Sequence, residues 1–278
     1  MKKSILKIIV LFTIALFVLA GAACRGNEEM NQLERIKKNG ELVIGAEVRF
    51  APYEFYYKNP ETGKEELAGF EMKIAQGLAD KLGVELKISD QAFSGLTTAL
   101  LGGEIDLLIS GLGITDARKE TIDFSEPYFF GNQVLLVRAE DVDKYKTPED
   151  LKGCTIAAKT GSIHQGIAEN QFPESKLMLL DQTGLLVAEL RQDTVDAVLV
   201  TDNAVFAYLK LYPELAISEV HVEYPVLGVG VGVRKGDNAE LIEFINGYLK
   251  EIQENGTLEK WIDEAVNQSA EMLAQENN

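Results

Sequence analysis

Beyond residue 40, short apolar or alternating runs take turns with stretches in which apolar residues recur every three to four positions. This pattern predicts strands followed by helices. Phe70, Ile74, Leu78 and Leu82 lie four residues apart, so they share one face of a helix that Gly83 is suited to end. In this half of the chain we expect strands at residues 41–46, 84–88, 105–110 and 134–138, and helices at residues 70–82 and 96–101, the second with Ser94 as its N-cap.

The same succession of elements starts again after residue 150. We expect strands at residues 155–158, 177–180, 195–200 and 226–233, and helices at residues 162–171, 183–191 and 203–211. Two further helices close the chain, because Leu241, Ile245, Leu249 and Ile252 share one face and a second apolar set begins at Leu258. Strands that alternate with helices predict an α/β fold. Because the second set interrupts the first, we expect two lobes joined by two connecting strands.

The N-terminus has the pattern of an export signal. Lys2 and Lys3 precede an apolar run at residues 8–19, which four small residues follow. This order predicts a secretory signal peptide over residues 1–23, with an uncleaved membrane anchor as the alternative. Export would place the rest of the chain outside the cytoplasm.

Cys24 directly follows the small residues and resembles the lipidated cysteine of bacterial lipoproteins. Two acyl chains on Cys24 would anchor the protein stably to a membrane face. Gly21 departs from that pattern, because lipoproteins usually carry a branched aliphatic residue at this place, and ordinary cleavage after Ala22 is the competing prediction. With the lipid in place, residues 24–32 are expected to form a short polar tether.

The charge balance argues against several classes of protein. The 278 residues include 27 basic and 44 acidic side chains, which gives a formal net charge of −17. General nucleic-acid binding needs Lys and Arg to neutralise phosphates, so it is not expected. Two Cys and two His leave little material for a disulfide framework or a metal cluster, so we expect neither a metal nor a cofactor.

Glycine strings do not support nucleotide binding. Gly228, Gly230 and Gly232 alternate with valines, which predicts a strand whose glycine face allows a close approach. Gly161 and Gly166 have the spacing of a phosphate-binding loop, but no lysine follows Gly166. We therefore expect no nucleotide site.

Two positions favour binding of an anion such as a carboxylate. Ser162 opens a predicted helix, whose first backbone N–H groups have no acceptor within the helix. Arg118 follows a predicted buried strand, where a guanidinium suits bidentate capture of a carboxylate. The alternative for Arg118 is a surface residue paired with Asp116 or Glu120. For His164 a surface position is favoured over the edge of a pocket.

Aromatic side chains cluster after the first predicted strand. Phe50 and Tyr53 belong to a group of five aromatic residues between positions 50 and 57, and Phe93 directly precedes a predicted helix. A loop with this many aromatic side chains can form the wall of a small-molecule pocket. Packing in the core is the alternative role for some of these rings.

The most specific motif lies at residues 103–137, GEIDLLISGLGITDARKETIDFSEPYFFGNQVLLV. Together with the shorter matches PYEF, GFE, FSGL, PEDLKG, VDAV and VRKGD, it resembles the polar amino-acid family of substrate-binding proteins of bacterial ABC importers, family 3 of the solute-binding proteins. The resemblance covers about residues 33–266. It implies a two-lobed clamshell of the type 2 periplasmic-binding-protein fold, each lobe a mixed sheet flanked by helices. Lobe one would span residues 33–135 and 226–278, lobe two would span residues 137–225, and two crossing strands would form the hinge.

The same resemblance implies a function. An amino acid or a related small carboxylate would bind in the cleft, the lobes would close over it, and a monomer would deliver it to an ABC permease in the membrane. An enzyme on the same fold, similar to cyclohexadienyl dehydratase, is the first alternative. It would need an acid or base in the cleft with a shifted pKa, and no motif demands one. A sensor or adhesion module is the second alternative.

The resemblance also assigns ligand contacts by position. Arg118 matches the arginine that grips the α-carboxylate of the ligand, and Ser162 and Ile163 match a helix start that offers backbone N–H groups from the other lobe. The backbone carbonyl of Gly111 would meet the α-ammonium. The other matched positions are the aromatic walls Phe50 and Phe93, the variable positions Glu47 and Lys159, and Gly113, Thr115, Thr201 and Asp202.

Two departures from the family pattern concern this site. Members usually have Thr or Ser at the position of Gly113, and its hydroxyl touches the ligand. They also carry an acid for the α-ammonium five residues after the position of Asp196, where this chain has Thr201 and places Asp202 one residue later. A shift of one residue along a strand turns a side chain to the other face. The sequence leaves open whether Asp202, Thr201 or Glu47 holds the ammonium.

Overall fold

The computed structural model describes residues 30–223 and 227–276. The predicted signal peptide, the predicted lipid site Cys24 and most of the predicted tether lie outside these residues. The first described helix begins at Gln32, because the side chain and the backbone N–H of Asn31 both form capping hydrogen bonds with its first turn.

Helices and strands alternate along the described chain. The helices are α2 (Gln32–Asn39), α3 (Phe70–Leu82), α4 (Phe93–Gly102), α5 (Asp116–Lys119), α6 (Ile163–Gln171), α7 (Thr183–Arg191), α8 (Asp202–Leu211), α9 (Ala239–Glu254) and α10 (Thr257–Glu276), with short 3₁₀ turns η1 (Ala139–Asp141) and η2 (Pro148–Leu151). The strands are β1 (Glu41–Ala46), β2 (Arg49–Phe50), β3 (Glu54–Lys58), β4 (Glu65–Ala68), β5 (Glu85–Asp90), β6 (Leu107–Leu108), β7 (Ile122–Phe124), β8 (Gln133–Arg138), β9 (Thr155–Lys159), β10 (Lys176–Leu180), β11 (Ala197–Thr201), β12 (Leu215–Ile217) and β13 (Gly232–Arg234).

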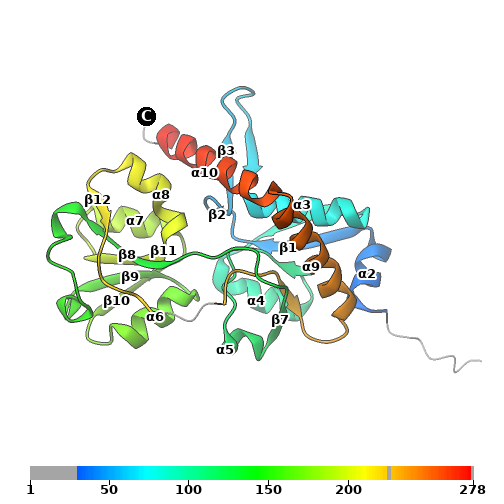
Figure 1. Cartoon of the computed structure of the whole chain (residues 1–278), viewed down its shortest axis with the longest axis horizontal. Coiled ribbons are helices and arrows are strands. Elements are labelled where there is room, and N and C mark those ends of the chain that lie inside the picture. Colours follow the sequence, from blue (N-terminus) through cyan, green and yellow to red (C-terminus); the bar gives the residue numbers. More distant parts are fainter. Residues whose placement is uncertain (1–29, 224–226, 277–278) are drawn as a thin grey trace, which may run out of the picture.

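Two five-stranded sheets form the cores of two lobes, which lie side by side in Figure 1. The sheet of lobe one has the order β5–β1–β6–β13–β7, with β1 parallel to β5 and β6 and with β13 antiparallel to β6 and β7. The sheet of lobe two has the order β10–β9–β11–β8–β12, with β9 parallel to β10 and β11 and with β8 antiparallel to β11 and β12. The small antiparallel sheet β2–β3–β4 stands beside lobe one. These mixed sheets confirm the predicted two-lobed α/β fold.

The chain crosses between the lobes twice. It leaves the first sheet after β7, enters the second at β8, and returns from β12 to β13 (Figure 1). Because β8 starts at Gln133 and pairs within the second sheet, the first crossing begins before that residue. Lobe boundaries at residues 33–135 with 226–278, and at residues 137–225, stay a proposal.

Two predicted strands are much shorter than the apolar runs suggested. The run at 105–110 forms only β6, because the carboxylate of Asp106 accepts the N–H of Val43 at 2.9 Å, where a strand carbonyl would otherwise be the acceptor. Of the described residues in the run at 226–233, only Gly232 and Val233 belong to a strand, β13, because the N–H of Val231 donates to the side-chain Oγ of Ser125 at 2.9 Å instead of to a strand carbonyl.

Ser94 was expected to cap a helix, and that prediction is wrong. Helix α4 already begins at Phe93, so Ser94 lies in its first turn, and Ala92 is the N-cap with no side-chain hydrogen bond. The side chain of Ser94 instead faces lobe two, where a Cβ built on Gly161 would lie 3.2 Å from it.

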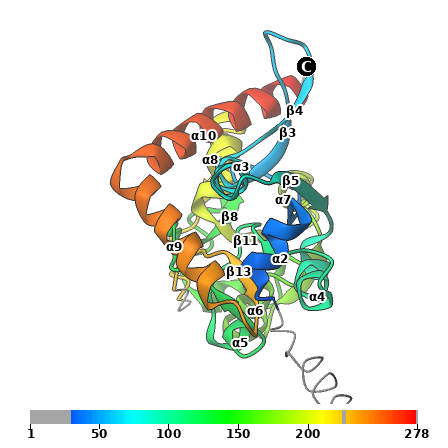
Figure 2. The ribbon, with the colours of Figure 1, turned by 90° about the vertical axis from the view of Figure 1, so that its right-hand side faces the viewer.

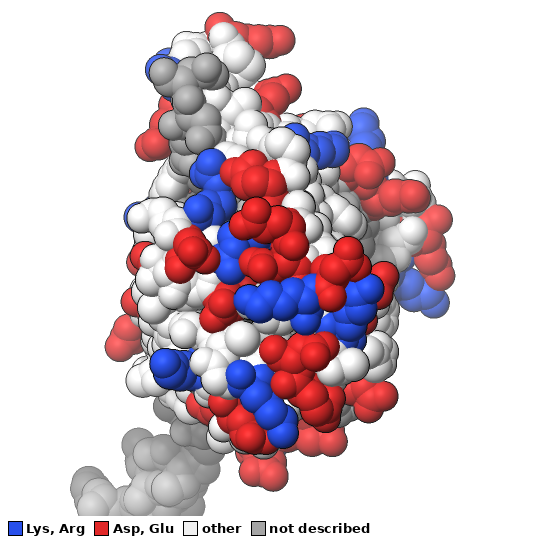
Figure 3. Space-filling view, turned by 90° about the vertical axis from the view of Figure 1, so that its left-hand side faces the viewer, with Lys and Arg blue, Asp and Glu red and all other residues white. Residues whose placement is uncertain are grey.

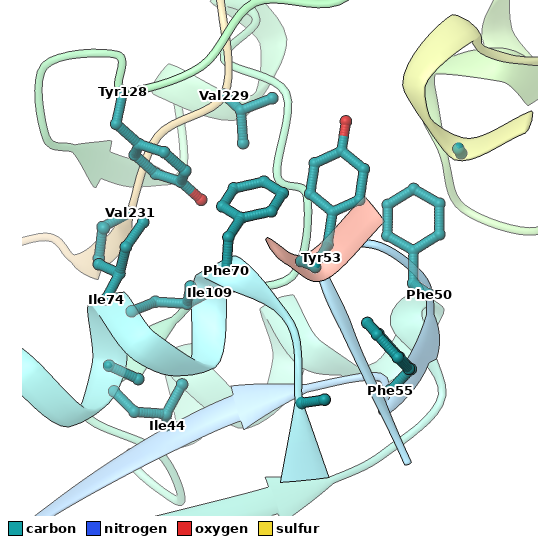
Figure 4. Packing of buried hydrophobic residues seen from close by; sticks show 14 of the residues in the cluster. Ile44, Phe50, Tyr53, Phe55, Phe70, Ile74, Ile109, Tyr128, Val229 and Val231 are labelled. Carbon is teal, nitrogen blue, oxygen red and sulfur yellow. The ribbon is translucent and has the colours of Figure 1, made fainter. Parts of the chain in front are cut away.

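Stacked rings form part of the core that supports the cleft. In Figure 4, Phe70 lies between Tyr128 and Tyr53, and Tyr53 stacks on Phe50 with 4.5 Å between ring centroids and 8° between ring planes. Tyr53 and Phe70 are almost completely buried. Each fully buried aromatic side chain of this kind stabilises the fold by roughly 1.5–3 kcal/mol. The core therefore fixes the position of Phe50 at the inner edge of lobe one.

Helix α10 contacts both lobes. Figures 1 and 2 show it running from the end of α9 along lobe one toward α8 of lobe two. It packs on α3, β3 and α8, and on β3 the Tyr57 hydroxyl donates to Oε2 of Glu271 at 3.1 Å. The lobes are thus connected by the packing of α10 as well as by the two chain crossings.

The surface of lobe two carries charges of both signs. On the face that Figure 3 shows, basic side chains are interspersed with acidic ones and form no continuous basic area. Within residues 30–223 and 227–276, no helix combines the length and the apolar character that a bilayer crossing requires.

Candidate functional site

A cavity lies between the lobes, and it brings together most of the residues that the sequence assigned to a ligand. The predicted residues that line it are Phe50, Phe93, Gly111, Gly113, Arg118, Lys159, Ser162, Ile163 and Thr201. Glu47, Thr115 and Asp202 do not line it. The described residues hold no cluster of three or more His, Cys, Asp or Glu side chains suited to a metal ion.

Arg118 stands at the cleft on the short helix α5. Thr115 begins this helix as its N-cap, and its Oγ1 accepts the N–H of Arg118 at 3.2 Å, so Thr115 supports the arginine from behind. Nη1 of Arg118 donates to the carbonyl of Gly113 at 2.8 Å, and Nη2 reaches across to the carbonyl of Gly161 in lobe two at 3.3 Å. The guanidinium also lies over the ring of Phe93, 5.6 Å from its centroid. A guanidinium held in this way suits a carboxylate bound between the lobes.

The start of α6 faces Arg118 from lobe two. Ser162 is the N-cap, as predicted, and its Oγ accepts the N–H of His164 at 3.1 Å and donates to the carbonyl of Lys159 at 2.7 Å. The backbone N–H of Ser162 also donates to Lys159, at 3.2 Å, so it is already in use. The first helical N–H, that of Ile163, has no acceptor within a helix, and the N-terminal end of the helix favours an anion.

Lys159 is the most unusual residue of the cavity, because it is a buried cation between two aromatic rings. Its Nζ lies 4.4 Å from the ring centroid of Phe50 and 4.7 Å from that of Phe93. It forms an ion pair with Glu47, across the lobes, and the two side chains are 6% and 4% exposed. Burial raises the pKa of the Glu47 carboxyl, and the neighbouring Lys159 opposes that rise. Oε1 of Glu47 is buried without a hydrogen-bond partner among the described residues.

His164 is buried in the wall of the cavity, so the favoured surface position is wrong. Its Nε2 lies 2.7 Å from Oε1 of Gln133, and since an amide oxygen only accepts, the proton is assigned to Nε2. Burial, reinforced by the charges of Lys159 and Arg118, lowers the pKa of His164 to about 3. His164 is therefore neutral at physiological pH.

A neutral buried His164 makes stability depend on acid pH. The unfolded chain binds a proton at His164 below pH 6.5 and the folded chain does not bind it until about pH 3. In that window the free energy of unfolding should fall with decreasing pH by up to about 1.4 kcal/mol per pH unit from this group. Denaturant titrations at several pH values should give a shallower dependence for His164→Gln, whereas His221→Gln, at an exposed histidine, should follow the wild type. Equal slopes for wild type and His164→Gln would contradict the assignment.

The region where the α-ammonium was expected contains a threonine. Thr201 lines the cavity at the end of β11, and its hydroxyl lies 3.3 Å from Oε1 of Gln133. Asp202 begins α8 on the other side of the chain and accepts from the side-chain amide of Asn132 at 2.8 Å. The offset of one residue thus turns the acid away from the cavity, and no strand bulge is needed to explain it.

The floor of the cavity is formed by the backbone after β6. Gly111 has φ +58°, and a Cβ there would lie 2.6 Å from the ring of Phe50, so both the conformation and the space demand glycine. Gly113 supplies the carbonyl that accepts from Arg118. A side chain at Gly111 would move the aromatic wall itself.

Some residues of the cavity were not predicted. They are Tyr53, Ser110, Phe130, Gly131, Gln133, Thr183, Leu186, Leu199, Val200, Gly228 and Val229. Tyr53 and Gly228 had appeared in the sequence as an aromatic neighbour and as a glycine in a strand, without an assigned contact. Gln133 is an ordinary polar residue at the start of β8, and only the fold places it beside His164.

Comparison with known proteins decides the family. The family model of the bacterial extracellular solute-binding proteins, family 3, matches residues 42–268. This chain belongs to that family. The resemblance inferred from the motif at residues 103–137 is therefore confirmed.

Individual relatives of family 3 align over almost the whole chain. The arginine-binding extracellular protein ArtP of Bacillus subtilis is 29% identical over 259 residues, which cover 91% of this chain and 95% of ArtP. The ABC transporter glutamine-binding protein GlnH of Bacillus subtilis is 31% identical over 279 residues, covering 93% and 96%. Among solved structures, an amino acid ABC transporter substrate-binding protein from Streptococcus pneumoniae bound to L-arginine superposes with a TM-score of 0.81 at 31% identity, covering 86% of this chain and 98% of that one.

Proposed function

We propose that this family 3 protein is the receptor of an ABC importer and captures an α-amino acid with an uncharged side chain, for which glutamine is the best fit. Arg118 and the start of α6, with Ser162 and Ile163, would bind the α-carboxylate from the two lobes. The floor at Gly111, together with Thr201, would face the α-ammonium. Because the ligand contacts more groups when the lobes are closed, binding would shift the protein toward the closed form.

The position of Lys159 is the observation that carries this choice of ligand. Its ammonium already lies between Phe50 and Phe93, where the side chain of a basic amino acid would gain most from aromatic rings. A second cation there would meet a like charge in a desolvated place, which costs several kcal/mol. The ammonium of Lys159 can instead donate a hydrogen bond to the amide oxygen of a glutamine side chain.

The charges of the site also favour a neutral side chain. Glu47 neutralises Lys159, and the carboxylate of the ligand would neutralise Arg118. His164 is neutral and the carboxylate of Asp202 is bound to Asn132 outside the cavity. A further net charge on the ligand would therefore find no counter-charge.

The relatives support an amino-acid ligand, and they differ in which one their names give. ArtP and the Streptococcus pneumoniae protein are described with arginine, whereas GlnH is described with glutamine. The pair of Lys159 and Glu47 is the reason to place this chain with the glutamine binder.

The cellular setting is part of the proposal. Residues 1–23 would direct export, Cys24 would carry the lipid that anchors the protein to the membrane, and a permease would receive the ligand from a monomer. ArtP, whose name gives an extracellular protein, and GlnH, whose name gives an ABC transporter protein, support this setting. Mass spectrometry of the mature N-terminus would find two acyl chains on Cys24, whereas an unmodified N-terminus would exclude the anchor.

An enzyme on the same fold is less well supported. For acid–base work the site offers His164, which lines the cavity, and Glu47, which does not. Glu47 is paired with Lys159, and the low pKa of His164 leaves it a poor base. No observation in the cavity favours a reaction over binding.

Thermal unfolding of the purified protein against a panel of amino acids tests the proposal. Glutamine at about 100 times its dissociation constant should stabilise the folded state by roughly 2.7 kcal/mol, visible as a rise in melting temperature. Asparagine and glutamate should act more weakly, and arginine, lysine and histidine should have little effect. A shift caused only by the cationic amino acids, or by none of the panel, would contradict the proposal.

A further inference from the structure

Two carboxyl groups lie directly beneath the floor of the cavity, and the ligand contacts described above do not use them. Glu54 is the first residue of β3 and Glu71 lies in the first turn of α3. Both are 0% exposed. Neither lines the cavity, and neither forms an ion pair with a described cation. Two buried acids without a salt bridge need another source of stabilisation.

Hydrogen bonds tie both carboxyl groups to the floor. Ser110 Oγ donates to Oε1 of Glu54 at 2.5 Å and accepts the backbone N–H of Glu47 at 3.0 Å. The N–H of Gly111 donates to both oxygens of Glu71, at 3.1 and 2.9 Å, and the hydroxyl of Tyr128 donates to Oε1 at 2.6 Å. Glu71 therefore acts as an acceptor at both oxygens, as a carboxylate does.

One carboxyl oxygen of Glu54, unlike those of Glu71, has no described donor. Its Oε2 is buried and receives no hydrogen bond from a described donor. A proton on that oxygen, donated to Glu71, satisfies both carboxyl groups at once. Burial raises the pKa of Glu54, and the charge of Glu71 raises it further. Among the facing groups, Lys159 opposes the rise, while the hydroxyls of Tyr53 and Tyr128 keep their protons because burial raises their pKa values as well.

The acceptor Glu71 sets the orientation of the floor. A peptide bond is planar and trans, so the carbonyl of Ser110 points opposite to the N–H of Gly111 that Glu71 holds. That carbonyl is thereby turned away from the buried acids. At Gly111 the backbone has a positive φ and passes close to the ring of Phe50. Loss of the acceptor would release this peptide, which directly precedes the Gly111 carbonyl that the ligand is expected to contact.

We propose that Glu54 and Glu71 are positioning residues, which share one proton beneath the cleft and fix the peptide between Ser110 and Gly111 for ligand binding. This inference rests on the proposed function, because the ligand is taken to bind on that floor. The shared proton would thus support ligand binding from below a cavity whose lining includes the charged residues Arg118 and Lys159.

The shared proton can be tested without a ligand. The unfolded chain loses the proton of Glu54 above about pH 4.5 and the folded chain keeps it, so the stability of the wild type should fall as pH rises through that range. Glu54→Gln keeps the shape and donates an amide proton to Glu71. Relative to this variant, the folding equilibrium constant of the wild type should fall by roughly tenfold per pH unit. Glu65→Gln, at an exposed acid on the neighbouring strand β4, should titrate like the wild type. Carbon NMR of the wild type should give the signal of a protonated Glu54 carboxyl above pH 4.5 and needs no variant.

The positioning role needs a binding measurement with L-glutamine as the probe. In Glu71→Gln the single side-chain oxygen must serve both Gly111 and Tyr128, so the dissociation constant should rise by roughly tenfold. Glu54→Gln should bind at least roughly tenfold more tightly than Glu54→Leu, which offers no hydrogen bond. Glu65→Gln should bind like the wild type.

The outcomes separate this inference from the proposed function. A pH dependence that is the same in wild type and Glu54→Gln, with an ionised Glu54 carboxyl in the NMR signal, would overturn the shared proton. Unchanged affinity in Glu71→Gln would overturn its positioning role. A wild type that does not bind L-glutamine would instead overturn the proposed ligand, and the pH dependence alone then decides for or against the shared proton.

Discussion

Arg118→Ala should weaken amino-acid binding by about 2–5 kcal/mol, because the half-buried, hydrogen-bonded guanidinium that would pair with the ligand carboxylate is removed and that charge is left unpaired between the lobes. This corresponds to a rise in the dissociation constant of roughly thirtyfold to several thousandfold. The guanidinium also bridges the lobes through the carbonyls of Gly113 and Gly161, so part of the loss should come from weaker closure. Isothermal titration calorimetry with L-glutamine measures the change.

The control for this substitution lies on the same short helix. Lys119→Ala removes a neighbouring exposed cation of α5, and its affinity should stay close to that of the wild type. Arg118→Lys should lose most of the affinity as well, because an ammonium cannot offer two parallel N–H groups. If Arg118→Ala bound glutamine as the wild type does, the carboxylate would have to lie elsewhere in the cavity.

Lys159→Met should change the preference of the site from glutamine to a cationic amino acid. Without Lys159, the space between Phe50 and Phe93 is free of positive charge and Glu47 is left buried without a partner. A ligand guanidinium can then take the place of the ammonium, with the same rings and the same carboxylate. We expect the affinity for arginine to rise by at least about tenfold and that for glutamine to fall by a similar factor, roughly 1.4 kcal/mol each.

The competing explanations of such a change are separated by two measurements. Lys176→Met alters an exposed lysine on the strand beside β9 and should leave both affinities unchanged. A Lys159→Met protein that melts cooperatively but gains no arginine affinity would show that the lysine does not exclude cationic ligands. Tight arginine binding by the wild type would lead to the same conclusion.

Most helices and strands of this fold could be predicted from the sequence, because apolar residues recur at a different spacing in a helix than in a strand. Helix α3 was predicted with its bounds, since four apolar residues repeat on one face and Gly83 ends it in a left-handed conformation. The two crossings were expected because the second set of elements interrupts the first, whereas the order of the strands within each sheet was not predicted. Strand β6 was too long in the prediction, because an apolar run cannot reveal that the side chain of Asp106 takes over a backbone hydrogen bond.

The site was predictable where a motif fixes both residue and place. Arg118 and Ser162 were identified from their local context, and the structure brings them to one cavity. The burial of His164 and its contact with Gln133 were not, because they depend on two strands and a helix meeting in three dimensions. The same limit applies to Lys159, which the sequence marked as a variable position without revealing that it lies between two rings.

The most direct test of the account is a crystal structure of the protein with L-glutamine bound. We predict the α-carboxylate within hydrogen-bonding distance of the guanidinium of Arg118 and of the first N–H groups of α6, with the side-chain amide oxygen next to Nζ of Lys159. A ligand bound in the reverse orientation, with its carboxylate on Lys159, would contradict the account. So would a glutamine side chain that displaces Lys159 from between Phe50 and Phe93.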